Sequence, residues 1–283
     1  MDEIAALPEG YQALFARARE VLASDERVRG LWLGGSLARG TADAASDLDL
    51  IVAVADDAHA EFAASWREWL ADITPTVLAG ELAFAPGSFF SVTPGFERLD
   101  VVVEKAGSIA DTFFRSRATV FDRDGLTARI PPPDPGPGPK GTVVGQLVTE
   151  FFRISIVETI LVRDDWLLAR EHLHALHGLI YRLFVEANAP LPPMGVKQWG
   201  TKLTPAQRAA LRALPTRADS RVELGDAQVA AGALFVTNAE VLARALDVEW
   251  PHDLEQAAAS HLRRQLGIEV AYPRLDHAVV GDR

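Results

Sequence analysis

The 283-residue sequence contains no cysteine, and this absence removes several kinds of chemistry at once. Disulfide cross-links, zinc sites built on cysteine thiolates and thiol nucleophiles are all excluded. The chain must therefore fold and act without cysteine chemistry.

The sequence also lacks the excess of basic residues that is typical of nucleic-acid-binding proteins. It has 39 acidic residues against 28 Lys and Arg, which gives a formal net charge of -11. A phosphate backbone is bound by clustered positive charge, so we expect no nucleic-acid partner. An acidic surface suits a cationic or small polar partner, although solubility alone would also explain it.

Long hydrophobic runs are missing as well. The most apolar stretch, residues 151–162 (FFRISIVETILV), contains Arg153 and Glu158 and is too short to span a bilayer. The N-terminal MDEIAALPEGYQ has neither the basic region nor the apolar region of a signal peptide. We therefore expect a cytoplasmic protein with no membrane partner. The sequence also contains no GxSxG, Walker A or Rossmann GxGxxG motif, so hydrolase and dehydrogenase functions have no support.

The residues that are present predict two domains. Apolar residues make up 48% of the chain and charged residues 24%, as in ordinary globular proteins. Strand and helix patterns alternate up to residue 130, the segment 131–139 is PPPDPGPGP, and the later patterns are almost all helical. We predict an α/β (α+β) domain with a mixed sheet over 1–130, a Pro/Gly-rich linker over 131–141 and an α-helical bundle over 142–283. In the first domain we expect helices at 7–25, 37–41 and 58–71, and strands at 29–34, 47–54, 75–84, 88–93, 98–104 and 118–125.

Two aspartates interrupt the predicted strand 47–54. Side chains at i and i+2 of a strand share a face, so Asp47 and Asp49 should project together. Two such carboxylates repel each other unless a cation neutralises them, and oxygen ligands at this spacing suit Mg²⁺. The alternative is an exposed edge strand that carries incidental acids.

A Gly34-Gly35-Ser36 turn lies about ten residues upstream of these aspartates. Glycines let backbone amides approach an anion closely, the Ser36 hydroxyl can donate to a phosphate oxygen, and Arg39 can bind phosphate with two hydrogen bonds. Ser36 is also a good N-cap for the predicted helix 37–41. An ordinary turn without a ligand is the alternative.

A third strand acid is Asp100, within RLDVVVE (98–104). If this strand neighbours strand 47–54, three carboxylates converge and can hold two divalent ions. The alternative for Asp100 is an ion pair with Arg98 or a charge at the edge of the sheet.

Taken together, Gly35-Ser36, Asp47-Leu48-Asp49-Leu50 and Leu99-Asp100-Val101 resemble the motifs of the nucleotidyltransferase superfamily typified by DNA polymerase β. A small catalytic domain followed by a helical bundle is similar to the antibiotic nucleotidyltransferases that modify aminoglycosides or lincosamides. The resemblance implies that a nucleoside triphosphate, expected to be ATP, binds with its phosphates against Gly35, Ser36 and Arg39.

The resemblance also implies the reaction. Asp47 and Asp49 would hold Mg²⁺, with two ions expected, and an acceptor hydroxyl would attack the α-phosphorus and release pyrophosphate. Asp100 would complete the second metal site or accept the hydroxyl proton. The expected acceptor is a small molecule. Transfer to a protein side chain and a non-catalytic, antitoxin-like nucleotide-binding module are the alternatives, and a homodimer is left open.

Two residues beyond the linker are further candidates. Glu150 lies three positions before Arg153 on a predicted helix, where it can form an intrahelical ion pair or serve as an acceptor-binding acid or helper base. Lys197, near Trp199, can contact the triphosphate or remain a solvated loop charge. The histidines at 172, 174 and 177 lack metal-ligand spacing, so we expect them to face solvent or to be hydrogen-bonded in the core.

Overall fold

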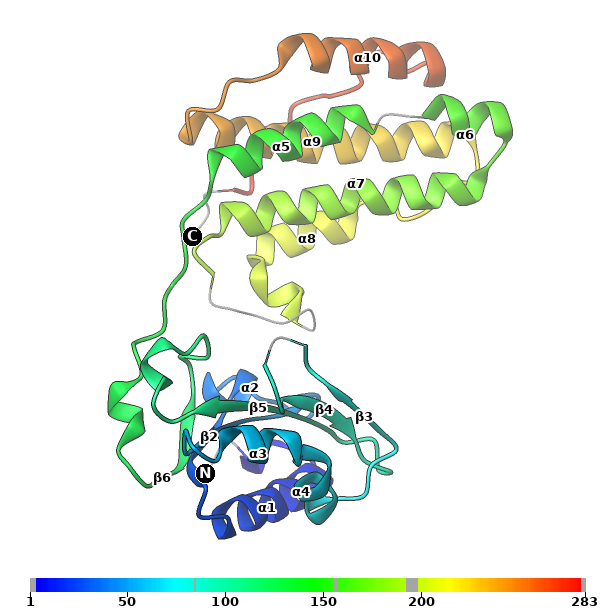
Figure 1. Ribbon diagram of the computed structural model, residues 1–283. Helices are drawn as coiled ribbons and strands as arrows, with labels where there is room; N and C mark the ends of the chain where they lie inside the picture. Colours follow the sequence, from blue (N-terminus) through cyan, green and yellow to red (C-terminus); the bar gives the residue numbers. More distant parts are fainter. Residues whose placement is uncertain (1–3, 84, 155–156, 192–197, 281–283) are drawn as a thin grey trace. The chain divides into compact units, whose positions relative to one another are not determined.

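Figure 1 shows a computed structural model of the chain, which describes all residues except 1–3, 84, 155–156, 192–197 and 281–283. The chain forms two compact units, Met1–Asp134 and Pro135–Arg283, which divide within the proline-rich segment. None of the helices in the described ranges combines the length and the apolar character needed to cross a membrane.

The N-terminal unit is built on a mixed sheet. Within its described residues six strands pair in the order β3-β4-β5-β2-β1-β6. β2 and β5 are parallel, and the other neighbouring pairs are antiparallel, which confirms the predicted mixed sheet. The strands are β1 (Val28–Leu33), β2 (Leu48–Val54), β3 (Leu78–Glu81), β4 (Phe89–Val92), β5 (Arg98–Lys105) and β6 (Ala118–Asp122).

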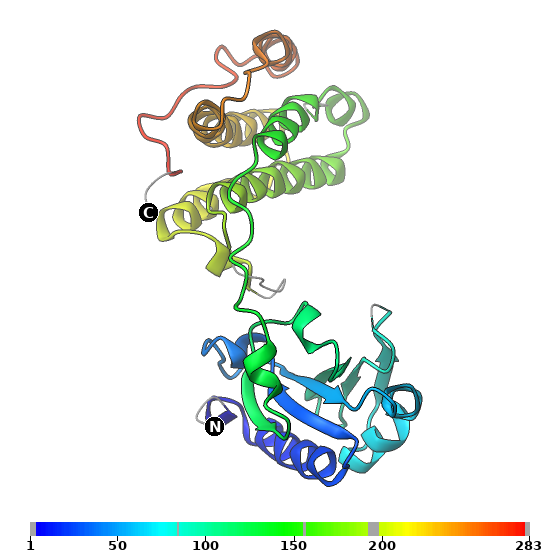
Figure 2. The same cartoon turned by 60° about the vertical axis from the view of Figure 1, so that its left-hand side comes forward.

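Both faces of the central strand β2 are covered. Helices α1 (Glu9–Ser24), α3 (His59–Ala64) and α4 (Trp66–Ile73) share a core with one face of the sheet, as Figures 1 and 2 show. On the other face, Ile51 and Ala53 pack with Ile109 and Leu126 from two 3₁₀ turns, η2 (Ile109–Asp111) and η3 (Leu126–Arg129). Burial on both faces explains why β2 is an almost continuous apolar run after Asp49.

The aromatic residues after β2 belong to the core. The Phe62 ring stacks on Trp69 with centroids 5.1 Å apart, and Trp66 stacks on Phe89 at 4.8 Å. The prediction of a single helix over 58–71 was wrong in one respect, because the helix is interrupted at Ser65 and forms two helices, α3 and α4.

The short helix α2 (Gly35–Ala38) follows β1 directly. Its N-cap is Gly34, so the predicted cap at Ser36 was wrong. The reason is that the Gly34 amide donates to the Asp49 carbonyl oxygen at 2.9 Å, which ties the turn to β2 and starts the helix one residue before Ser36. A short 3₁₀ turn, η1 (Ile4–Ala6), precedes α1.

The C-terminal unit is helical, as predicted. Its elements are α5 (Gly141–Arg153), α6 (Val157–Arg163), α7 (Trp166–Ala187), the 3₁₀ turn η5 (Gly200–Lys202), α8 (Pro205–Ala213), α9 (Arg221–Ala245) and α10 (His252–Leu266). α5, α7 and α9 lie side by side around one core, where the Phe151 and Phe235 rings stack at 3.9 Å. Asp165 caps α7 by accepting a hydrogen bond from the Leu168 amide.

Candidate functional site

The pairing of β2 with β5 brings the strand acids together. In this parallel ladder Asp49 lies directly opposite Asp100, and adjacent strands are about 4.8 Å apart. Asp47 lies two residues before Asp49, just ahead of β2. The condition stated for convergence, that strand 98–104 neighbours strand 47–54, is therefore met, and Asp49 and Asp100 share a face of the sheet because they are register partners.

The Gly35 backbone lies against the carboxylate of Asp49. Gly35 has a φ of +53°, in the left-handed region that favours glycine. A Cβ atom at this position would lie 1.9 Å from Asp49 Oδ2, which is far inside any allowed contact. Glycine is therefore needed here for its backbone conformation and for its close approach to the acid. The turn and the acids form one site.

Burial and charge both act on Asp49. Desolvation, followed by the nearby negative charges of Asp100 and Asp47, raises the pKa of Asp49 from 3.8 to about 6. Arg98 and Arg39 act in the opposite direction and lower the pKa of Asp49. Ionisation of the Asp49 carboxyl therefore costs free energy unless a cation lies nearby.

Arg98 forms an ion pair with one of the acids, Asp100. Its Nε and Nη2 atoms donate to Asp100 Oδ1 and Oδ2, each at 2.8 Å. The two residues are two apart on β5 and therefore on one face of the strand. The ion-pair interpretation of Asp100 is confirmed, and it coexists with the convergence of Asp100 on Asp49. The sequence suggested Arg98 only as an ion-pair partner that would account for Asp100. The spacing of two residues on one strand could have indicated that Arg98 positions the Asp100 carboxylate.

Removing the Arg98 charge tests this electrostatic coupling. In the metal-free protein, Arg98→Gln is expected to raise the pKa of Asp49 further, because Arg98 favours the ionised carboxylate. Carboxyl-carbon NMR titration measures this shift directly. Arg19→Gln, at an exposed position on α1, is the matched control. An unchanged Asp49 titration in Arg98→Gln would contradict the coupling.

Asp47, Asp49 and Asp100 are the candidate donor set for a divalent cation. Among the residues that the structure describes, no three acidic or histidine side chains are already close enough to form a metal cage. Asp47, Asp49 and Asp100 nevertheless offer only oxygen donors, and the raised pKa of Asp49 shows that added positive charge would be favourable there. The residues fit Mg²⁺, and their assignment as its ligands stays a prediction.

The other predicted phosphate contacts lie in or directly after the α2 turn. Ser36 is within the first turn of α2 and Arg39 is its C-cap, and both are partly exposed. Arg39 is close enough to Asp49 to lower the pKa of that carboxyl. The structure therefore gathers Gly35, Ser36 and Arg39 beside Asp49, although nothing in it tests phosphate binding.

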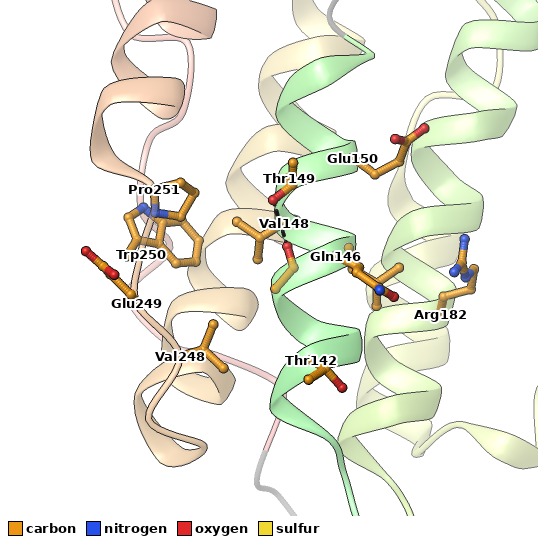
Figure 3. Close-up of a pocket in the computed structure, with 12 residues that line it drawn as sticks. Thr142, Gln146, Val148, Thr149, Glu150, Arg182, Val248, Glu249, Trp250 and Pro251 are labelled. Carbon is orange, nitrogen blue, oxygen red and sulfur yellow. Dashed lines mark hydrogen bonds between the residues drawn. The ribbon is translucent and has the colours of Figure 1, made fainter.

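Glu150 lies in the C-terminal unit. Its carboxylate accepts two hydrogen bonds from the Arg153 guanidinium, at 2.7 and 2.8 Å, which confirms the ion-pair interpretation. Glu150 also lines a hollow of about 770 Å³ that Gln146, Arg182 and Trp250 help to form (Figure 3). A role for Glu150 in acceptor binding or proton transfer stays a prediction.

The remaining candidate residues are Lys197 and the histidines. Lys197 lies outside the described residues. His172 is buried and hydrogen-bonded to Gln228 at 2.8 Å, as expected of a core histidine. Burial lowers the pKa of His172, so this ring is held neutral at physiological pH.

Comparison with known proteins bears on the N-terminal unit. Residues 16–79 match the family model described as a nucleotidyltransferase domain. This unit carries a nucleotidyltransferase domain. The matched range contains the Gly34-Gly35-Ser36 turn with Asp47 and Asp49, and it ends before Asp100, whose place opposite Asp49 comes from the sheet register.

No curated protein sequence matches the chain significantly. Among solved structures, an aminoglycoside 6-adenyltransferase from Bacillus subtilis is similar at 16% identity, with a TM-score of 0.43. That alignment covers 89% of this chain and 96% of the other.

Proposed function

We propose that the N-terminal unit transfers a nucleoside monophosphate, AMP from ATP, to a hydroxyl group of a small molecule in a Mg²⁺-dependent reaction. The observation that carries this proposal is the opposition of Asp49 and Asp100 on β2 and β5, beside the Gly35 turn. Acidic side chains that offer only oxygen donors thus lie beside a backbone turn of the kind that can bind phosphate.

The turn residues would bind and orient the triphosphate. A backbone without a Cβ at Gly35 lets amides approach phosphate oxygens, the Ser36 hydroxyl donates a further hydrogen bond, and the Arg39 guanidinium binds an oxygen pair. Asp47, Asp49 and Asp100 would hold Mg²⁺, which when bound neutralises phosphate charge and stabilises the charge that develops in the transition state.

Asp100 would also receive the proton of the acceptor. The acceptor oxygen forms a bond to the α-phosphorus, the bond from that phosphorus to the bridging oxygen breaks, and pyrophosphate leaves. The hydroxyl proton passes to a carboxylate oxygen of Asp100. The two hydrogen bonds from Arg98 fix the orientation of that carboxylate, so Arg98 acts as a positioning residue.

The acceptor that we propose is a cationic polyhydroxyl compound of the aminoglycoside type or a lincosamide. The net charge of -11 supports a positively charged acceptor, because an acidic protein attracts it over long range. The helical C-terminal unit would supply acceptor contacts, with Glu150 as one candidate.

A labelling assay tests the proposal. The protein is incubated with α-labelled ATP, Mg²⁺ and a panel of aminoglycosides and lincosamides, and both labelled product and pyrophosphate are measured. We expect label on at least one antibiotic, equimolar pyrophosphate, and no transfer when the metal is chelated. Absence of both label transfer and pyrophosphate over the whole panel would contradict the small-molecule proposal, and label on a protein band would indicate a protein acceptor instead.

A further inference from the structure

A pocket lies between α7 and α8 of the C-terminal unit, with a volume of about 330 Å³. This volume is within the range of small-molecule sites. His174, His177, Gly178 and Tyr181 contribute one face of α7 to it, since they are spaced by three and four residues. A Cβ atom at Gly178 would meet nothing within 4 Å, so the space beside this glycine, which lines the pocket, is open.

A rigid aromatic wall borders this α7–α8 pocket. The rings of Tyr181 and Trp199 stack in parallel, with centroids 3.7 Å apart and an interplanar angle of 7°. The Tyr181 hydroxyl donates to the Trp199 carbonyl oxygen at 3.2 Å, which fixes the pair further. Trp199 nevertheless remains 51% exposed. A large flat surface is therefore held in place and left available to a planar ligand.

The charge of the pocket is opposite to that of the chain. Its described lining includes two arginines, Arg208 and Arg212, and no acidic residue, although the protein carries a net charge of -11. Arg208 donates to the Gly200 carbonyl oxygen at 3.1 Å. Arg212 is exposed and has no ion-pair partner within the described residues. A guanidinium in this setting favours an anionic group with two oxygens.

We propose that the α7–α8 pocket binds a small molecule in which a flat aromatic ring carries a phosphate or carboxylate group. The ring packs on Trp199 over Gly178, and the anionic group is bound by Arg212, with Arg208 adding positive charge. This site lies wholly within the C-terminal unit and does not involve the strand acids, so it stands or falls independently of the proposed nucleotidyl transfer.

Isothermal titration calorimetry in the absence of divalent metal tests the proposal, with 1-naphthyl phosphate as the probe. We expect saturable binding at least roughly tenfold tighter than that of 1-naphthol or of inorganic phosphate, each of which supplies only half of the recognised chemistry. If 1-naphthyl phosphate does not bind saturably, or binds no more tightly than phosphate alone, the proposal is overturned.

Variants locate the binding. Gly178→Leu places a side chain in the open space beside this lining glycine and should abolish binding, and leucine favours the helix more than glycine does. Arg212→Gln should weaken binding roughly tenfold and retain the fold, because Arg212 is exposed. Arg163→Gln, at an exposed site on α6, is the matched control and should leave affinity unchanged. Equal binding by all of these variants would place the ligand elsewhere and overturn the proposal.

Competition identifies the source of the ligand chemistry. AMP and 1-naphthoate are each titrated against bound 1-naphthyl phosphate in the wild-type protein. Displacement of the probe by AMP indicates a nucleotide, and displacement by 1-naphthoate indicates an aromatic acid. Probe binding that persists unchanged in Gly178→Leu would contradict binding in the α7–α8 pocket.

Discussion

Replacing Asp49 by asparagine is expected to abolish nucleotidyl transfer and, at the same time, to stabilise the folded protein at neutral pH. Transfer should fall by about a thousandfold or more, because the variant loses a carboxylate at the centre of the site. The gain in stability follows from burial, since the pKa of Asp49 is raised from 3.8 to about 6 in the folded protein. An ionised carboxylate there is unfavourable, and the amide has no charge to desolvate.

The sign of the pH dependence is fixed by this shift. Between about pH 4 and pH 6 the folded state binds more protons at Asp49 than the unfolded state does, so the free energy of unfolding decreases as the pH rises through this window. The shift of the Asp49 pKa from 3.8 to about 6 lowers the free energy of unfolding by roughly 2–3 kcal/mol above pH 6. The stabilisation of Asp49→Asn should therefore be full at pH 7–8 and should vanish near pH 4.

Denaturant unfolding at several pH values and the labelling assay measure the two effects separately. Asp57→Asn, which changes an exposed aspartate just after β2, is the control and should leave both unfolding and transfer nearly unchanged. A stability gain that is the same at pH 4 and pH 8 would contradict the burial argument. Retained transfer in Asp49→Asn would remove Asp49 from the catalytic site.

Gly35→Ala is expected to lower the proposed nucleotidyl transfer by displacing Asp49. The left-handed φ of +53° by itself costs a non-glycine residue about 1 kcal/mol. The added methyl group would also lie 1.9 Å from Asp49 Oδ2, so the turn or the carboxylate has to move. A displacement of about 1 Å at reacting groups can lower rates by about a hundredfold. We therefore expect at least that loss of transfer.

Gly40→Ala is a matched control for this substitution. Gly40 has a similar φ of +66°, but an added Cβ there meets nothing within 4 Å. The Gly40→Ala variant should lose about 1 kcal/mol of stability through backbone strain alone and keep its transfer rate. If Gly35→Ala and Gly40→Ala had the same effect on transfer, the close approach of Gly35 to Asp49 would have no catalytic importance.

Much of the fold could be read from local patterns. The apolar run after Asp49, the alternating residues around Asp100 and the helical spacing of the C-terminal half each depend on neighbours in the chain, and each predicted element formed. The break of the predicted helix 58–71 at Ser65 was missed, because a continuous apolar face does not reveal where a helix must turn to follow a sheet.

For the candidate site, the residue types could be predicted from the sequence, but their arrangement in space could not. The sequence by itself determined that Asp47, Asp49 and Asp100 lie in or next to strands and that a glycine turn precedes them. Only the tertiary structure decided that Asp100 lies opposite Asp49, that Arg98 holds Asp100 by two hydrogen bonds, and that Gly35 lies against Asp49. Strand order and register arise from pairing between distant segments, which local propensity does not encode.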